Sequence, residues 1–160
     1  MTGILIKNLT VLLGCIIFIV LWFLKYKRSL KTKKDYMKRS ELYYTSKKWL
    51  NTIDLEIKAL SKFEFTTEEE IIILFIIANS YYELKEYNLA VEYYEKAFEY
   101  TFSCNKEYYY ADSFIFALES LINLGRINEA KKLFFKITYN KDSKKEFKKL
   151  FKFAEKNNLV

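Results

Sequence analysis

The fold class is decided by residues 67–100, which read TEEEIIILFIIANSYYELKEYNLAVEYYEKAFEY. Periodicity alone leaves the apolar run at residues 71–77 open to a buried strand or a buried helix, so the chemistry at its start must decide. Thr67 and Glu70 have the spacing of a capping box, in which each side chain accepts a hydrogen bond from the other residue's backbone N–H. Neither glycine nor proline interrupts the stretch. The sequence therefore predicts helices here and an all-α protein.

Large and small apolar residues follow one another in this stretch as they do in a helical hairpin. The segment Lys85–Asn88 is the predicted turn, with Asn88 as the N-cap of the second helix. The residues in this pattern are Leu74, Ile77, Ala78, Tyr81, Ala90, Tyr94 and Ala97.

This pattern resembles the tetratricopeptide repeat, a unit of about 34 residues that folds as two antiparallel helices. The resemblance implies that Ala78 and Ala90 let the two helices approach closely, that large residues fill the groove between them, and that Ala97 takes a packing position late in the second helix. The resemblance is clearest over residues 71–98, although the turn glycine of the family is missing there. It recurs in degenerate form over residues 111–137, where Gly125 matches that glycine. The resemblance implies a short solenoid of helical hairpins, and an amphipathic hairpin with alanines outside this family is the alternative.

The flanking segments extend this domain over residues 40–160. Residues 40–64 are predicted to form a helical hairpin or one bent helix, as an atypical terminal unit of the stack. Residues 101–106 are the predicted loop after the central repeat. Ser143 and Glu146 predict a second capping box, before an amphipathic helix that closes the stack and carries lysines on its other face.

The N-terminal segment predicts a transmembrane helix over Ile4 to Leu24, in residues 1–24. Lys7 is the only charge in this span, and as a helix the span would measure about 31 Å, the thickness of a bilayer's hydrocarbon core. A cleavable secretory signal is the first alternative, but the positive charge follows the apolar run instead of preceding it. Lipid attachment at Cys15 is the second, but apolar residues continue past the cysteine where a polar segment is expected.

A basic juxtamembrane linker is predicted at residues 25–39. The positive-inside rule places this cluster, and with it residues 25–160, in the cytoplasm, with the N-terminus outside. The prediction is thus a single-pass membrane protein. The cluster either sets topology alone or also contacts anionic lipid at the membrane surface. The basic residues expected at that surface are Lys25, Lys27, Arg28, Lys31, Lys33 and Lys34.

Residue types that commonly carry catalysis or bind metals are scarce. The chain has no histidine, and its two cysteines, Cys15 and Cys104, are too far apart in sequence to suggest a zinc cluster. A glycine-rich phosphate loop is also absent from the sequence. We therefore expect no enzymatic activity, no catalytic residues, no metal and no cofactor.

Binding is the better prospect. In the tetratricopeptide family the first helix of each unit lines a concave groove, and Asn79 matches one position of a clamp that binds C-terminal carboxylates. Phe75 stands where the lysine of that clamp would be, so the resemblance implies an apolar or basic peptide or helix instead. Packing of Ile72 and Phe75 on neighbouring helices is the alternative. The implied groove residues are Ile72, Phe75, Asn79, Tyr82, Glu83, Asp112, Ile115, Glu119 and Ile122.

The predicted function is a membrane-anchored adaptor or scaffold that holds a partner protein at the cytoplasmic face. The expected partners are another protein or peptide and the lipid bilayer, while the oligomeric state stays open. One alternative is an envelope or surface assembly factor with its repeat domain outside the membrane. Another is a nucleic-acid-binding protein that uses the basic, aromatic-rich C-terminal helices, although the acidic residues 40–125 make nucleic acid an unlikely partner.

Overall fold

The structure is a computed structural model that describes residues 12–21, 30–104, 111–139 and 145–160. The chain divides into two compact units, Met1–Thr32 and Lys33–Val160. In the described residues the only regular elements are helices, so the all-α prediction is confirmed for this part of the chain.

The first unit contains a helix at residues 12–21, whose apolar side chains are exposed. In the part of the chain that the structure describes, no helix combines the length and the apolar character needed to cross a membrane. This finding overturns the predicted transmembrane helix Ile4 to Leu24 and the single-pass topology built on it. Residues 4–11 and 22–24 of that span lie outside the described residues.

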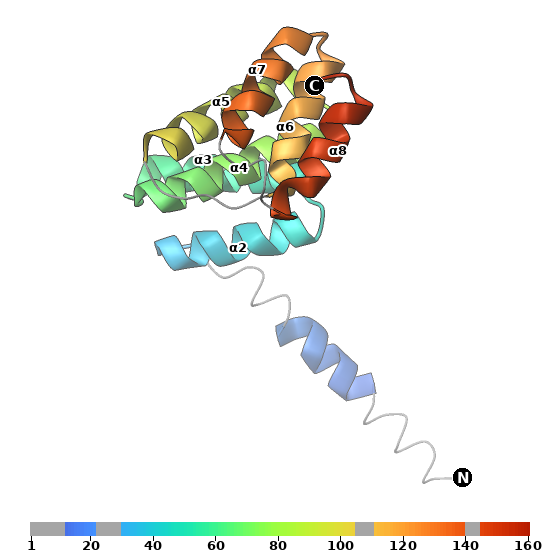
Figure 1. The fold of residues 1–160 in the computed structure, drawn as a ribbon. Coiled ribbons are helices and arrows are strands. Elements are labelled where there is room, and N and C mark those ends of the chain that lie inside the picture. The colour runs from blue at the N-terminus through green and yellow to red at the C-terminus, as the bar shows by residue number, and fades with distance from the viewer. Residues whose placement is uncertain (1–11, 22–29, 105–110, 140–144) are drawn as a thin grey trace, which may run out of the picture. The chain divides into compact units, whose positions relative to one another are not determined.

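The second unit is a stack of helical hairpins (Figure 1). α2 pairs with α3, α4 with α5, and α6 with α7, and neighbouring hairpins meet where α3 packs on α4 and α5 packs on α6. The predicted unit at residues 40–64 is therefore a hairpin, and its first helix begins inside the segment predicted as a linker. The elements are α2 (Lys33–Thr45), α3 (Trp49–Lys62), α4 (Thr67–Glu83), α5 (Tyr87–Ser103), α6 (Asp112–Asn123), α7 (Ile127–Thr138), η1 (Lys145–Phe147) and α8 (Lys148–Lys156).

The hairpin turns share one construction. The second residue after the first helix of each hairpin lies in the left-handed region, with φ of 56° at Lys47, 61° at Lys85 and 73° at Gly125. In the central turn the N–H of Lys85 donates to the Tyr82 carbonyl (2.8 Å) and the N–H of Glu86 donates to the Tyr81 carbonyl (3.0 Å). This is the Schellman pattern, which satisfies carbonyls at the helix end. Lysine thus replaces the glycine that the sequence analysis found missing.

The central hairpin differs from prediction at both helix starts. The capping box of α4 lies one residue earlier than predicted: the Glu69 N–H donates to Thr66 Oγ1 (3.3 Å) and the Thr66 N–H donates to Glu69 Oε2 (2.8 Å). α5 begins at Tyr87 after Glu86, so the predicted N-cap Asn88 is wrong. Because the Schellman turn closes α4 within two residues, the next helix starts before Asn88 is reached.

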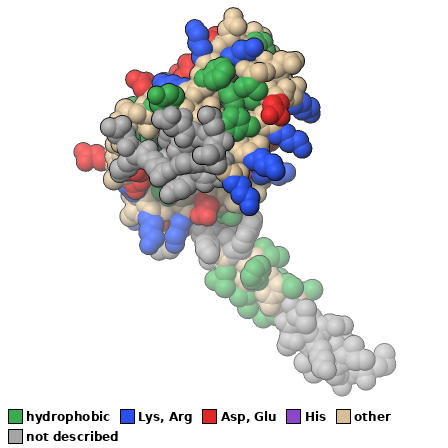
Figure 2. Space-filling model, viewed as in Figure 1, with side chains coloured by type: hydrophobic (Ala, Val, Ile, Leu, Met, Phe, Trp, Pro, Cys, Tyr) green, Lys and Arg blue, Asp and Glu red, His purple; other side chains and the backbone are tan. Residues whose placement is uncertain are grey.

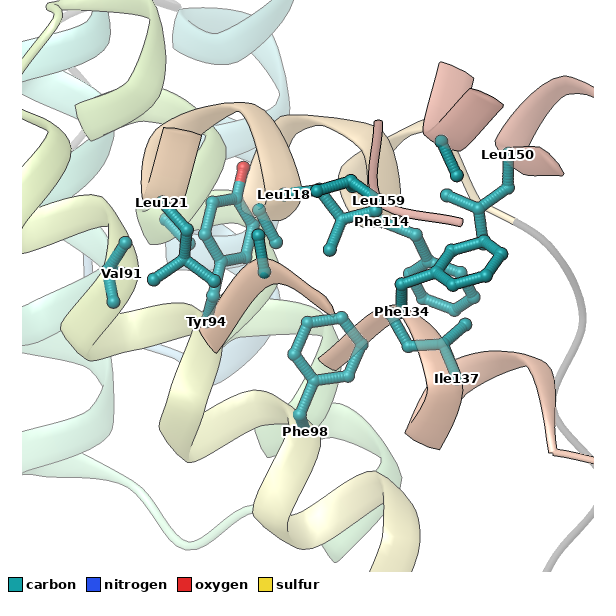
Figure 3. Packing of buried hydrophobic residues seen from close by; sticks show 14 of the residues in the cluster. Val91, Tyr94, Phe98, Phe114, Leu118, Leu121, Phe134, Ile137, Leu150 and Leu159 are labelled. Atoms are coloured by element: carbon teal, nitrogen blue, oxygen red, sulfur yellow. The ribbon is translucent and has the colours of Figure 1, made fainter. Parts of the chain in front are cut away.

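The hydrophobic core runs through α4 to α8. Alanines at the helix contacts are almost fully buried: Ala78 and Ala90, which were predicted at close-approach positions, and Ala97, which was predicted at a packing position, are each 0% exposed. Figure 3 shows Tyr94 and Phe98 of α5 together with residues of α6, α7 and the C-terminal segment. A smaller cluster of Ile53, Ile73 and Ile77 joins α3 to α4.

The C-terminal segment packs against the main core cluster. Phe147, Leu150 and Ala154 are buried in the main cluster, and Leu159 adds a buried contact that the sequence analysis missed. The predicted capping box cannot be placed, because Ser143 and the side chain of Glu146 lie outside the described residues. α5 continues to Ser103, so the predicted loop at residues 101–106 is wrong over its first half.

Candidate binding pocket

A pocket of about 690 Å³ opens between α5 and α7, above α6. Both α5 and α7 pack on α6, which presents the small side chain of Ala117 to the space between them. Aromatic and aliphatic side chains line the pocket, including Phe98 and Phe102 of α5 and Leu133 of α7. The result is an apolar concavity formed by the second helices of two adjacent hairpins.

The two walls of the pocket carry different charges. The α5 wall contributes Glu95 and Glu99, and the α7 wall contributes Lys132 and Lys136 together with Glu129 at its beginning. All five side chains belong to exposed residues. An acidic wall therefore faces a wall that is mainly basic, across an apolar interior.

Two contacts bridge the walls at opposite ends of the pocket. Arg126 Nη2 lies 3.1 Å from Glu95 Oε1, and it also pairs with Glu129 Oε2 at 2.6 Å. The hydrogen bond from Arg126 lowers the pKa of Glu129 below its usual range. At the other end, Lys136 Nζ lies 4.4 Å from the ring centre of Phe102, a cation–π contact. Residue numbers rise in the same direction along both walls, so α5 and α7 run the same way.

Between these bridges lie two charged groups without such contacts. In the described part of the chain, neither Glu99 nor Lys132 forms a hydrogen bond or an ion pair. Lys132 acts on its helical neighbour Glu129 through its charge, which also lowers the pKa of that carboxyl group. The middle of the pocket thus offers one carboxylate and one ammonium group to a ligand. This arrangement can bind a ligand, because a mostly apolar concavity with a few charged groups is typical of ligand sites.

Asn79, one of the predicted groove residues, forms hydrogen bonds with residues on other helices. Its Nδ2 donates to Ser113 Oγ (3.0 Å) and to the Tyr44 hydroxyl (3.3 Å), and its Oδ1 accepts from the Tyr94 hydroxyl (2.7 Å). Asn79 is 8% exposed, so the side chain is buried within this network. Its role in the fold is structural.

Other predicted groove residues pack against neighbouring helices of the stack. The Tyr82 hydroxyl donates to Glu119 Oε2 (2.8 Å), and the Tyr82 ring stacks on Phe116 with centroids 4.5 Å apart. Burial raises the pKa of the Tyr82 hydroxyl, and its hydrogen bond to Glu119 acts in the same direction. Phe75 packs edge-on against Phe98 at 5.3 Å. Ile115 and Ile122 also pack on the main core cluster.

The remaining predicted residues are exposed. Ile72 is 55% exposed on α4, and Glu83 lies at the exposed end of the same helix. Asp112 begins α6 and lies 3.7 Å from Lys149 Nζ, a contact between exposed side chains. The predicted groove set is thus divided between contacts inside the fold and separate exposed positions.

The pocket residues were missed because the family resemblance directed attention to the first helix of each hairpin. Phe98 and Phe102 follow Tyr94 at intervals of four residues, which is a continuous apolar stripe along α5. This stripe is visible in the sequence. Because a loop was predicted from residue 101, Phe102 was not counted as part of the helix.

The basic residues predicted to lie at the membrane surface are found in different environments. Lys25, Lys27 and Arg28 lie outside the described residues, and Lys31 and Lys34 are exposed. Lys33 instead contacts the Glu69 carboxylate and lies 4.4 Å from the Phe65 ring centre, so it helps to fix the start of α4. On α8, Lys148, Lys149, Lys152 and Lys156 are exposed, and Figure 2 shows Lys and Arg side chains gathered on the side where Figure 1 draws this helix.

Comparisons with family models, with curated proteins and with solved structures gave no match to this chain.

Proposed function

We propose that this chain is a protein-interaction module of tetratricopeptide type, an adaptor or scaffold that holds a partner through the pocket between α5 and α7. Stacked hairpins with buried alanines at the helix contacts support the family assignment. The repeated left-handed residue at Lys47, Lys85 and Gly125 supports it as well, because each hairpin then turns in the same way.

The pocket itself carries the functional proposal. Ligand sites in proteins are concave and mostly apolar, with a few polar groups that fix orientation, and volumes of about 300–1,000 Å³ are typical. The pocket at about 690 Å³ has this size, an interior that includes Phe98, Phe102 and Leu133, and charged side chains on its walls.

A peptide or helix is a better occupant than a small metabolite. The two bridges span Arg126 to Lys136 along α7, which corresponds to about 15 Å or nearly three helical turns. An amphipathic helix that lays its apolar face in a groove needs this length and uses anchors spaced by one or two turns.

The test is selection of binding peptides from a displayed library of 12- to 16-residue sequences, with the full chain as bait. Selected peptides are then titrated by fluorescence anisotropy against the wild type, Leu133→Gln and a matched control, Leu50→Gln. Leu50 is 69% exposed on α3, outside the pocket. We expect Leu133→Gln to weaken binding at least tenfold and the control to leave it unchanged, with both variants retaining the wild-type circular dichroism. Equal binding by all three proteins would overturn the proposal.

A further inference from the structure

We infer that the pocket takes an amphipathic helix with basic side chains on the edge that faces α5 and acidic side chains on the edge that faces α7. This inference rests on the proposed function and adds the chemistry of the partner. It starts from the apolar interior, which calls for an apolar stripe on the occupant.

The charge pattern comes from the middle of the pocket. Glu99 and Lys132 have neither hydrogen bonds nor ion pairs in the described residues, whereas Glu95 and Glu129 at one end are already paired with Arg126. A helix bound between the walls brings one edge close to Glu99 and the other close to Lys132. A helix edge with the same charge as the wall that it faces would be repelled by that wall. Because the two walls present opposite charges, the two edges of the helix must also carry opposite charges.

The same arrangement sets the direction of the bound helix. Turning a helix end for end in the groove exchanges the edges that face α5 and α7. Only one direction then satisfies both Glu99 and Lys132. The apolar stripe makes the same contacts in both directions of the helix. The charges of Glu99 and Lys132 therefore determine which direction is more stable.

Three synthetic helical peptides test this inference. Each carries the same apolar stripe, with one Lys edge and one Glu edge, two Lys edges, or two Glu edges. Compensating charges on the solvent face give all three the same net charge, so long-range attraction is equal. They are titrated against the full-length wild type, Glu99→Lys, Lys132→Glu, and the control reversals Glu83→Lys and Lys156→Glu, both exposed and outside the pocket.

We expect the wild type to bind the mixed-edge peptide about fivefold more tightly than either other peptide, because contacts between exposed charges are individually weak. Glu99→Lys should shift the preference to the peptide with two Glu edges, and Lys132→Glu to the one with two Lys edges. Both preferences should shrink in high salt, and the control reversals should keep the wild-type preference.

The outcomes separate this inference from the proposed function. Equal affinity for all three peptides, or a preference unchanged by both reversals, would overturn the charge rule and leave the pocket as a binding site. If the wild type binds none of them, a helical partner of this kind is refuted, and the library selection with Leu133→Gln still decides whether the pocket binds other peptides.

Discussion

Replacement of Asn79 by alanine should destabilise the protein by about 3 kcal/mol. Its amide bonds the hydroxyl groups of Tyr44, Tyr94 and Ser113, which lie on three other helices. Tyr94 is 1% exposed, so removal of its acceptor leaves a buried hydroxyl group without a partner. That loss costs about 1–3 kcal/mol. Tyr44 and Ser113 are half-buried and can bond water, so we assign them about 0.5–1 kcal/mol each.

A double-mutant cycle checks where this energy comes from. Urea unfolding of the wild type, Asn79→Ala, Tyr94→Phe and the double variant is followed by circular dichroism at pH 7. Once Asn79 is gone, removal of the Tyr94 hydroxyl relieves an unpaired group. The double variant should therefore cost about 1–2 kcal/mol less than the sum of the single variants.

Two results would refute this reasoning. Additivity of the two substitutions within about 0.5 kcal/mol would show that the Asn79–Tyr94 contact carries no energy of its own. A loss of less than 1 kcal/mol in Asn79→Ala would show that Asn79 is not a structural residue.

Three further predictions concern turns, caps and pH. Lys85→Gly should raise the free energy of unfolding by about 1 kcal/mol, and Gly125→Ala should lower it by a similar amount, because both positions have positive φ. Thermal unfolding measures both changes. A lower stability of Lys85→Gly would contradict the left-handed conformation at this turn. Thr66→Ala should cost about 1 kcal/mol in urea unfolding by removing the α4 cap, and no loss would place the cap at Thr67. Burial raises the pKa of Glu56 above its usual 4.5, although Ser40 donates to it, so the folded state holds the proton longer. Wild-type stability should fall as pH rises from about 4.5 through the raised pKa, by at most about 1.4 kcal/mol per pH unit. Glu56→Gln should remove this slope, and equal slopes in both proteins would contradict it.

Local chemistry made much of the helical core readable from the sequence. The alanines and large apolar residues of residues 71–98 identified the hairpin, because their spacing depends on the contact between its own two helices. The sequence did not determine which threonine caps α4. Thr66 and Thr67 each have a glutamate three residues later, so either pair could form the capping box. The contacts of Lys33 with Glu69 and Phe65 favour the earlier pair, and such contacts join residues that are distant in sequence.

The first helix of the stack shows the same limit. α2 is mostly polar, and its contacts depend on α3: Ser40 donates to Glu56, and Tyr36 packs edge-on against Phe63 at 5.3 Å. A basic segment therefore looked like a linker. At the N-terminus, apolar composition over residues 4–24 predicted a membrane crossing, whereas no helix among the described residues has the length and apolar character for one.

The sequence did not show that polar groups on α4, which looked available to a ligand, already have partners in the next hairpin. Asn79 reaches Ser113, and Tyr82 reaches Glu119. Sequence patterns identify which side of a helix is polar, but they do not show which polar groups a neighbouring hairpin will satisfy.

The Asn79 network has a consequence for how the protein unfolds. Repeat stacks in which each unit contacts only its neighbours can lose terminal units one at a time. Asn79 joins α4 to Tyr44 in the first hairpin, to Tyr94 in its own and to Ser113 in the third. Loss of either terminal hairpin therefore breaks a hydrogen bond at the centre of the stack. The hairpins should unfold in one cooperative transition, with no stable product in which an end hairpin has come away.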